Sequence, residues 1–193
     1  MRVAGACDGE DRNGSRRELR VSRTVPRDHA ERKCRSFLEL DRAKRSVLVS
    51  ACLLGRRCRY DGSTNRDREL ERELESQGFE IVPFCPEEHG ELGTPRPPAW
   101  IESRSAADVL DGKDRVVTDA GVDVTAQFLK GATGALETCR AHGIRLAFLK
   151  ERSPSCGVCK THVAHGLADG PGVTAALLAR NGIEVRPVEG RRE

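Results

Sequence analysis

From Ser46 onward, short aliphatic runs alternate with helical stretches, and few folds accept that order of elements. The aliphatic runs have the length of strands and occupy residues 46–50, 80–84, 145–150 and 183–185. The helical stretches occupy residues 64–78, 123–143 and 172–182. Strand and helix in alternation predict a three-layer α/β/α domain with a mostly parallel, Rossmann-like sheet. Residues 88–120, rich in Gly, Pro and charge, are expected to form a long excursion over the edge of this sheet.

The first 45 residues differ in character from the rest of the chain. They carry 13 Lys and Arg against 8 Asp and Glu, which leaves 20 against 22 in residues 46–193. We therefore expect a basic polar leader at 1–45, disordered apart from a short helix near 28–44, and an α/β domain at 46–193. The leader could be an RNA-binding or regulatory arm, or the result of a misassigned start codon. The core is not basic enough to predict binding of nucleic acid.

Hydropathy and cysteine content suggest the compartment. No segment approaches the ~18 consecutive apolar residues that a membrane helix needs, and the N-terminus has no apolar signal core. We therefore expect a cytoplasmic protein. In a reducing cytosol the eight cysteines indicate metal binding, catalysis or simple burial instead of disulfides.

Three of the cysteines follow three of the expected strands. Cys52 ends "VLVSAC", Cys85 ends "EIVPFC", and Cys156 lies just beyond the third run in "LAFLKERSPSC". The carboxyl ends of parallel strands lie at one edge of a sheet, so these thiols should converge in one crevice. Three thiolates can hold an iron–sulfur cluster and leave one iron open, whereas a structural zinc site wants four protein ligands. The alternative is that each cysteine is a small buried apolar residue.

The same segments resemble the motifs of a known family. "SACLLGRRCRYDG", "CPEEHGELGTPRPP", "DVTAQFLKGA", "LKERSPSCG" and "GVTAALLARNGIEV" are similar, in this order, to motifs of the DUF523 family, typified by thiouracil desulfidases. The resemblance covers residues 46–187. It implies an enzyme in which Cys52, Cys85 and Cys156 bind a [4Fe-4S] cluster with one open iron that takes sulfur from a thiolated base. Cys58, Cys139 and Cys159 fall outside that ligand set.

Desulfuration also needs groups that handle protons and position the substrate. Glu87, two residues after a ligand, is the candidate acid or base, and its alternative role is a salt bridge to Arg96. Ser153 could bind the substrate, or could cap the turn that Pro154 enforces. Asp61 is expected to be a turn residue. The histidines at 89, 162 and 165 are not expected to be ligands, although 162 and 165 lie in a tract that departs from the family pattern.

The expected activity is therefore a non-redox conversion of C=S to C=O, with sulfide release, on a small thiolated heterocycle. Two other classes stay open. One is a cluster-free thiol or persulfide enzyme in which Cys156 or Cys52 is the nucleophile. The other is a module that binds zinc or senses redox state. The sequence predicts neither the natural substrate nor the oligomeric state.

Overall fold

The main sheet of the protein contains four parallel strands. In the computed structural model, which describes residues 45–164 and 166–190, these are β1 (Ser46–Ser50), β2 (Glu80–Phe84), β5 (Leu146–Lys150) and β8 (Glu184–Val188). Their order in the sheet is β2-β1-β5-β8, and each adjacent pair is parallel. The expected parallel sheet is confirmed. The last strand is longer than the expected 183–185 because it pairs with β5 along the full length of both strands.

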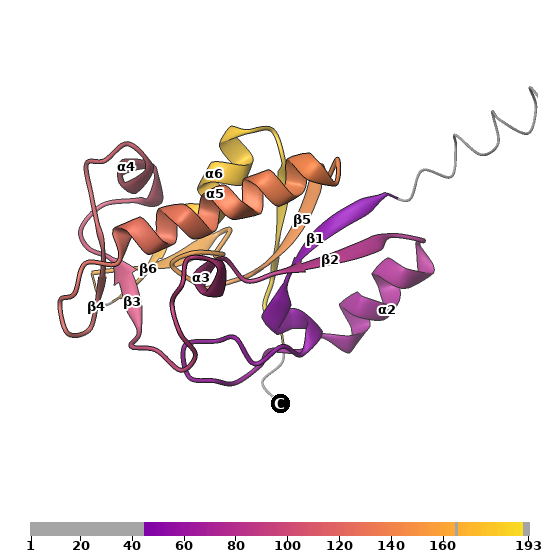
Figure 1. The fold of residues 1–193 in the computed structure, drawn as a ribbon, viewed down its shortest axis with the longest axis horizontal. Helices are drawn as coiled ribbons and strands as arrows, with labels where there is room; N and C mark the ends of the chain where they lie inside the picture. The colour runs from indigo at the N-terminus through magenta and orange to yellow at the C-terminus, as the bar shows by residue number, and fades with distance from the viewer. Residues whose placement is uncertain (1–44, 165, 191–193) are drawn as a thin grey trace, which may run out of the picture. The chain divides into compact units, whose positions relative to one another are not determined.

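Helices cover both faces of the main sheet. Helix α2 (Arg68–Ser76) lies on one side of β1 and β2, and α5 (Thr125–Ala141) with α6 (Val173–Arg180) lies on the other (Figure 1). Alternate residues of β1 pack into the apolar cores on the two faces of the sheet. Val47 and Val49 cluster with Leu74 of α2, whereas Leu48 clusters with Ala135 of α5. This alternation follows from the two-residue repeat of a strand. The three-layer architecture is thereby confirmed.

Burial differs between the central and the outer strands. Val47, Leu48 and Val49 of β1 are at most 1 % exposed, because β1 has a paired strand on each side and helices on both faces. The outer strands β2 and β8 contain Pro83 and Pro187. Proline has no N–H to donate to a neighbouring strand, so it is tolerated at sheet edges. β1 is thus the buried centre of the sheet, and the chain turns from it into the first cysteine motif.

A second sheet lies where the sequence predicted a long excursion. Its strands are β3 (Ala99–Ile101), β4 (Val116–Thr118), β6 (Lys160–Val163) and β7 (Gly166–Asp169), in the order β4-β3-β6-β7. The segment expected to be a long excursion over the sheet edge, residues 88–120, therefore supplies two strands and the helix α4 (Ala106–Leu110). The sequence did not reveal these strands because three or four residues are too few to show a repeat.

The second sheet has its own apolar core. Ile101 and Val116 are fully buried on one face of the sheet, where they cluster with Phe128 of α5 and Val173 of α6. Helices α5 and α6 thus contact both sheets and hold them together. Among the described residues, no helix has the length and apolar character that crossing a membrane requires. The expected leader at 1–45, with its short helix, falls almost entirely outside the described residues.

Candidate metal centre and active site

The three predicted cysteines line one cavity of about 1020 Å³. Cys52 lies in the 3-10 turn Ala51–Leu54 that follows β1, and Cys85 caps the short helix α3 (Pro86–His89) after β2. Cys156 lies in the turn after β5. The chain leaves β1 toward β2 on one side and leaves β5 toward β8 on the other, so a crevice opens at the carboxyl ends of β1 and β5. The strand order therefore brings together cysteines that are distant in the sequence.

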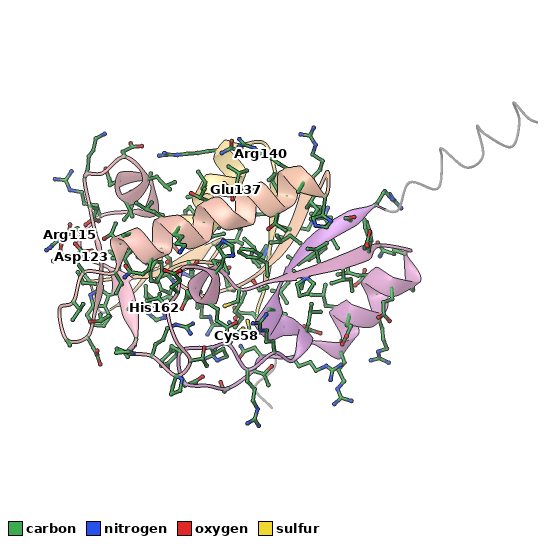
Figure 2. All side chains as sticks on the ribbon, viewed as in Figure 1. Cys58, Arg115, Asp123, Glu137, Arg140 and His162 are labelled. Carbon is green, nitrogen blue, oxygen red and sulfur yellow. The ribbon has the colours of Figure 1, made fainter. Side chains whose placement is uncertain are left out.

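Cys58 is a fourth thiol in the same cavity, and its sequence context did not predict a place in the site. Its side chain is 2 % exposed, and Figure 2 labels it near the turn that follows β1. The Sγ atoms of Cys58 and Cys85 and a carboxylate oxygen of Glu88 lie within 4.8 Å of one another. The Cys85 thiol also contacts the Cys58 carbonyl oxygen at 3.8 Å. The spacing C-x5-C in "CLLGRRC" was the available signal, but it resembles no metal motif.

The environment of these cysteines favours the protonated thiol when no metal is bound. Interaction with the Cys52 side chain, together with burial, raises the pKa of Cys58 to about 12. The Cys58 side chain and burial raise the pKa of Cys85, and burial raises the pKa of Cys156. Metals bind thiolates, so loading this site must release protons and should be favoured by rising pH.

Backbone contacts hold the turn that carries Cys156. The carboxylate of Glu151, which is 5 % exposed, accepts N–H bonds from Val158 (2.8 Å), Cys159 (3.0 Å) and Lys160. At the start of α6, the N–H of Val173 donates to the Pro154 carbonyl. This role of Glu151 could not be predicted from the sequence, because a charged residue at the end of a strand ordinarily faces water.

Gly172 is required by the close approach of this turn to α6. A Cβ at Gly172 would lie 2.6–2.7 Å from the carbonyl oxygens of Ser153, Pro154 and Ser155, which is too close for any side chain. The first turn of α6 thus donates to the carbonyls of the Ser-Pro-Ser segment, since the first N–H groups of a helix have no partner within it. The position of Cys156 is fixed from both sides, by Glu151 and by α6.

Glu87 and Ser153, the two predicted catalytic residues, contact each other. The Ser153 hydroxyl lies 3.4 Å from Glu87 Oε1, and both side chains line the cavity. Arg96 donates to Glu87 Oε2 through Nε at 2.9 Å and through Nη2. The same Nη2 donates to the Cys58 carbonyl at 3.0 Å. The salt bridge considered as an alternative is present, and it holds Glu87 at the cavity. Ser153 Oγ also accepts the N–H of Cys156 at 3.0 Å, so it caps the turn as well.

Of the remaining acidic, histidine and cysteine candidates, some line the cavity and others do not. Asp61 accepts from the N–H and hydroxyl of Ser63, as expected of a turn residue. His89 packs on Phe84, with ring centroids 5.1 Å apart, and is not at the cavity. Cys139 is buried in α5, whereas Cys159 is exposed. His162 does line the cavity, and His165 lies outside the described residues.

The donor set fits an iron–sulfur cluster. Cys52, Cys85 and Cys156 are unbridged cysteines with sulfur as the donor atom, and all of them line one cavity. Thiolate sulfur is the ligand that iron–sulfur clusters use. A mixed sulfur and carboxylate set, such as Cys58, Cys85 and Glu88, would also accept zinc. These donors are suited to a soft metal, and a carboxylate–serine pair lies beside them.

Comparisons with known proteins identify the family. Residues 47–189 match the family model described as 2-thiouracil desulfurase. The chain is 37% identical over 142 residues to the uncharacterized protein YbbK of Bacillus subtilis (strain 168), covering 72% of this chain and 93% of that protein.

A solved structure described as a [4Fe-4S]-dependent thiouracil desulfidase, TudS (DUF523Vcz), is 43% identical. The match has a TM-score of 0.64 and covers 75% of this chain and 91% of that one. The family model and this match confirm the resemblance to DUF523. The chain belongs to the 2-thiouracil desulfurase family and is an enzyme that cleaves carbon–sulfur bonds.

Proposed function

We propose that the protein removes sulfur from a thiolated nucleobase or a related small thio-heterocycle, with water as the oxygen source and a [4Fe-4S] cluster as cofactor. The observation that carries the proposal is the Glu87–Ser153 pair beside the converging thiols in one cavity. Family membership and the similarity to a solved desulfidase named as [4Fe-4S]-dependent support it.

Cys52, Cys85 and Cys156 would hold the cluster, since each follows a strand of the main sheet and faces the cavity. When bound, the cluster supplies a thiophilic iron without a protein ligand, which draws sulfur away from carbon. Cys58 lies beside this set and is not assigned as a ligand. The cytoplasmic location stays a prediction from the sequence.

Glu87 would move the protons. Arg96 occupies Oε2 with two donors, so Oε1, which faces Ser153, is the oxygen free to take a proton from the attacking water. The same oxygen can return that proton to the departing sulfur. Ser153 holds Oε1 in place through its hydroxyl and positions the ring of the substrate. In sum, a thiocarbonyl and water give a carbonyl and hydrogen sulfide, and no atom changes its oxidation level.

The test uses the full chain, loaded anaerobically with iron and sulfide and given 2-thiouracil. We expect uracil and sulfide in equal amounts, with no reductant added. Glu87→Gln should keep the iron and lose roughly 10²–10⁴-fold in kcat, the usual contribution of general acid–base catalysis. Glu91→Gln is the matched control, because Glu91 is exposed and forms a salt bridge with Lys130.

Three results would contradict the proposal. Turnover that consumes a reductant in every cycle would overturn the non-redox mechanism. A colourless protein with stoichiometric zinc would favour the zinc-binding module, to which Cys58, Cys85 and Glu88 are suited. A colourless and metal-free protein that still releases sulfide would favour a cysteine nucleophile.

A further inference from the structure

One wall of the cavity comes from the second sheet and takes no part in the proposed chemistry. Trp100 of β3 and His162 of β6 both line the cavity, as does Leu167 of β7. β3 and β6 are parallel with Ile101 opposite Val163, which places Trp100 next to His162. β6 and β7 are antiparallel with His162 opposite Leu167. The three side chains therefore stand in one row across three strands, on the face opposite the sheet's own core.

Exposed apolar side chains also gather in this cavity. Among the described residues, three large hydrophobic side chains are exposed, namely Tyr60 (41 %), Val122 (57 %) and Leu167 (47 %). All three line this cavity, and Leu167 belongs to the wall itself. Exposed apolar side chains that gather in one place mark a binding surface, whereas scattered ones need no explanation. Figure 2 labels His162 near the strands of the second sheet.

The size of the cavity also exceeds what a bare pyrimidine needs. Its volume of about 1020 Å³ lies at the top of the roughly 300–1,000 Å³ range of pockets that enclose drug-sized ligands. The cluster that the cysteines would hold takes part of this space, and Glu87 and Ser153 account for the reacting end of a substrate. The proposed reaction gives Trp100, His162 and Leu167 no role, yet this row bounds the same space.

We propose that the substrate is a thiolated heterocycle that carries a bulky apolar or aryl substituent, which packs against Trp100, His162 and Leu167. This proposal rests on the proposed desulfuration, because the thiocarbonyl must face the cysteines for the substituent to lie on this wall. Tyr60 and Val122 contribute further apolar surface to the same cavity. The imidazole of His162, placed between an indole and an isobutyl group, offers one hydrogen bond to a polar atom of the ring.

The activity test compares 2-thiouracil with its propyl and benzyl derivatives at ring positions 1, 5 and 6, using the cluster-loaded full chain. Each buried methylene can add up to about fourfold in binding, so at least one benzyl isomer should exceed 2-thiouracil in kcat/KM by about tenfold or more. His162→Ala and Leu167→Ser should reduce this preference ratio at least threefold. His142→Ala is the matched control, because the imidazole of His142 is exposed at the end of α5, away from the cavity.

A binding measurement separates this proposal from the desulfuration. Trp100 is the chain's single tryptophan, so its fluorescence reports directly on the wall. Benzyluracils contain no sulfur, and at least one isomer should bind about tenfold more tightly than uracil. Desulfuration of every compound without preference, and equal binding of uracil and benzyluracils, would overturn the substituent pocket and leave the activity standing. Preferential binding without desulfuration would overturn the activity and leave the pocket standing.

A second copy of the chain, or the leader, could cover the same wall instead. Analytical ultracentrifugation of the full chain and of the chain beginning at Arg45 checks this. Self-association that Leu167→Ser abolishes, or a preference that appears only after removal of residues 1–44, would overturn the proposal.

Discussion

The cavity has two dissimilar sides, one built from strand ends and one from a strand face. On the main sheet, the functional residues lie just beyond the strands, as Cys52 does after β1 and Cys156 does after β5. On the second sheet, Trp100, His162 and Leu167 lie within the strands and project from one face. On the first side, hydrogen bonds to Glu151 and from the start of α6 hold the backbone of the turn that carries Cys156. The second is held by strand pairing and by the apolar core on the other face of its sheet, and its side chains line the cavity.

This difference indicates that the two sides have different functions, namely cofactor binding and substrate preference. Residues at strand ends need exact positions, because a metal ligand that is displaced by an ångström no longer binds. Glu151 and the start of α6 provide that precision for Cys156. Residues on a strand face can be exchanged without disturbing the backbone, since only the side chain changes. We therefore expect substitutions at the strand ends to abolish the cofactor, and substitutions on the wall to alter substrate preference.

The largest expected effect is the loss of iron when a predicted ligand is replaced. Cys52→Ser, Cys85→Ser and Cys156→Ser should each lose nearly all bound iron, because serine oxygen is a harder and poorer ligand. Iron and sulfide analysis after anaerobic loading measures this. Cys139→Ala, a buried cysteine in α5, and His162→Ala on the wall should retain full iron content.

Cys58→Ser sharpens the same experiment, because Cys58 lies beside Cys85 and yet is not assigned as a ligand. We expect this variant to keep most of its iron. Complete loss of iron would make Cys58 a fourth ligand and would remove the open iron from the proposal.

A smaller effect is expected from the carboxylate that holds the Cys156 turn. Glu151→Gln leaves one oxygen to accept three backbone N–H groups and introduces an amide donor that opposes them. Hydrogen bonds to a charged group contribute roughly 1.5–3 kcal/mol each, so we expect a loss of about 3 kcal/mol in the free energy of unfolding. Urea unfolding of the metal-free protein measures it. The Glu151→Gln variant should also retain less iron on dilution, because Glu151 holds the turn that carries Cys156.

The matched control for Glu151 is Glu184→Gln. Glu184 is exposed on β8 and pairs with Arg186, so its replacement should change stability by no more than about 0.5 kcal/mol. Equal stability of Glu151→Gln and Glu184→Gln would show that the carboxylate of Glu151 does not hold the turn.

The smallest expected effect is that of removing residues 1–44. Both sides of the cavity are built from residues 50–190, and Arg45 should be kept because its guanidinium lies 4.9 Å from the centre of the Phe79 ring. The chain beginning at Arg45 should bind the same iron and unfold within about 0.5 kcal/mol of the full chain. Loss of folded protein or of iron would show that the leader belongs to the domain.

The local pattern of the sequence determined where the chemistry gathers. Uninterrupted aliphatic runs predict strands, and parallel strands bring their carboxyl ends to one edge, so the sequence alone predicts that Cys52, Cys85 and Cys156 lie together. The sequence also predicts that Glu87 and Ser153 lie at the site. Each is within three residues of one of these cysteines, and so short a segment cannot place it far away.

Only the tertiary structure decided what surrounds those residues. Cys58 follows no strand, and its position depends on how the turn after β1 folds back, where Arg96 donates to its carbonyl. Glu151 acts through N–H groups seven to nine residues further along the chain. The wall of Trp100, His162 and Leu167 depends on pairing between strands of three or four residues, and β3 is some 60 residues away from β6 in the chain. Such short strands carry no repeat of their own, and their pairing is set by the core that they share with α5 and α6.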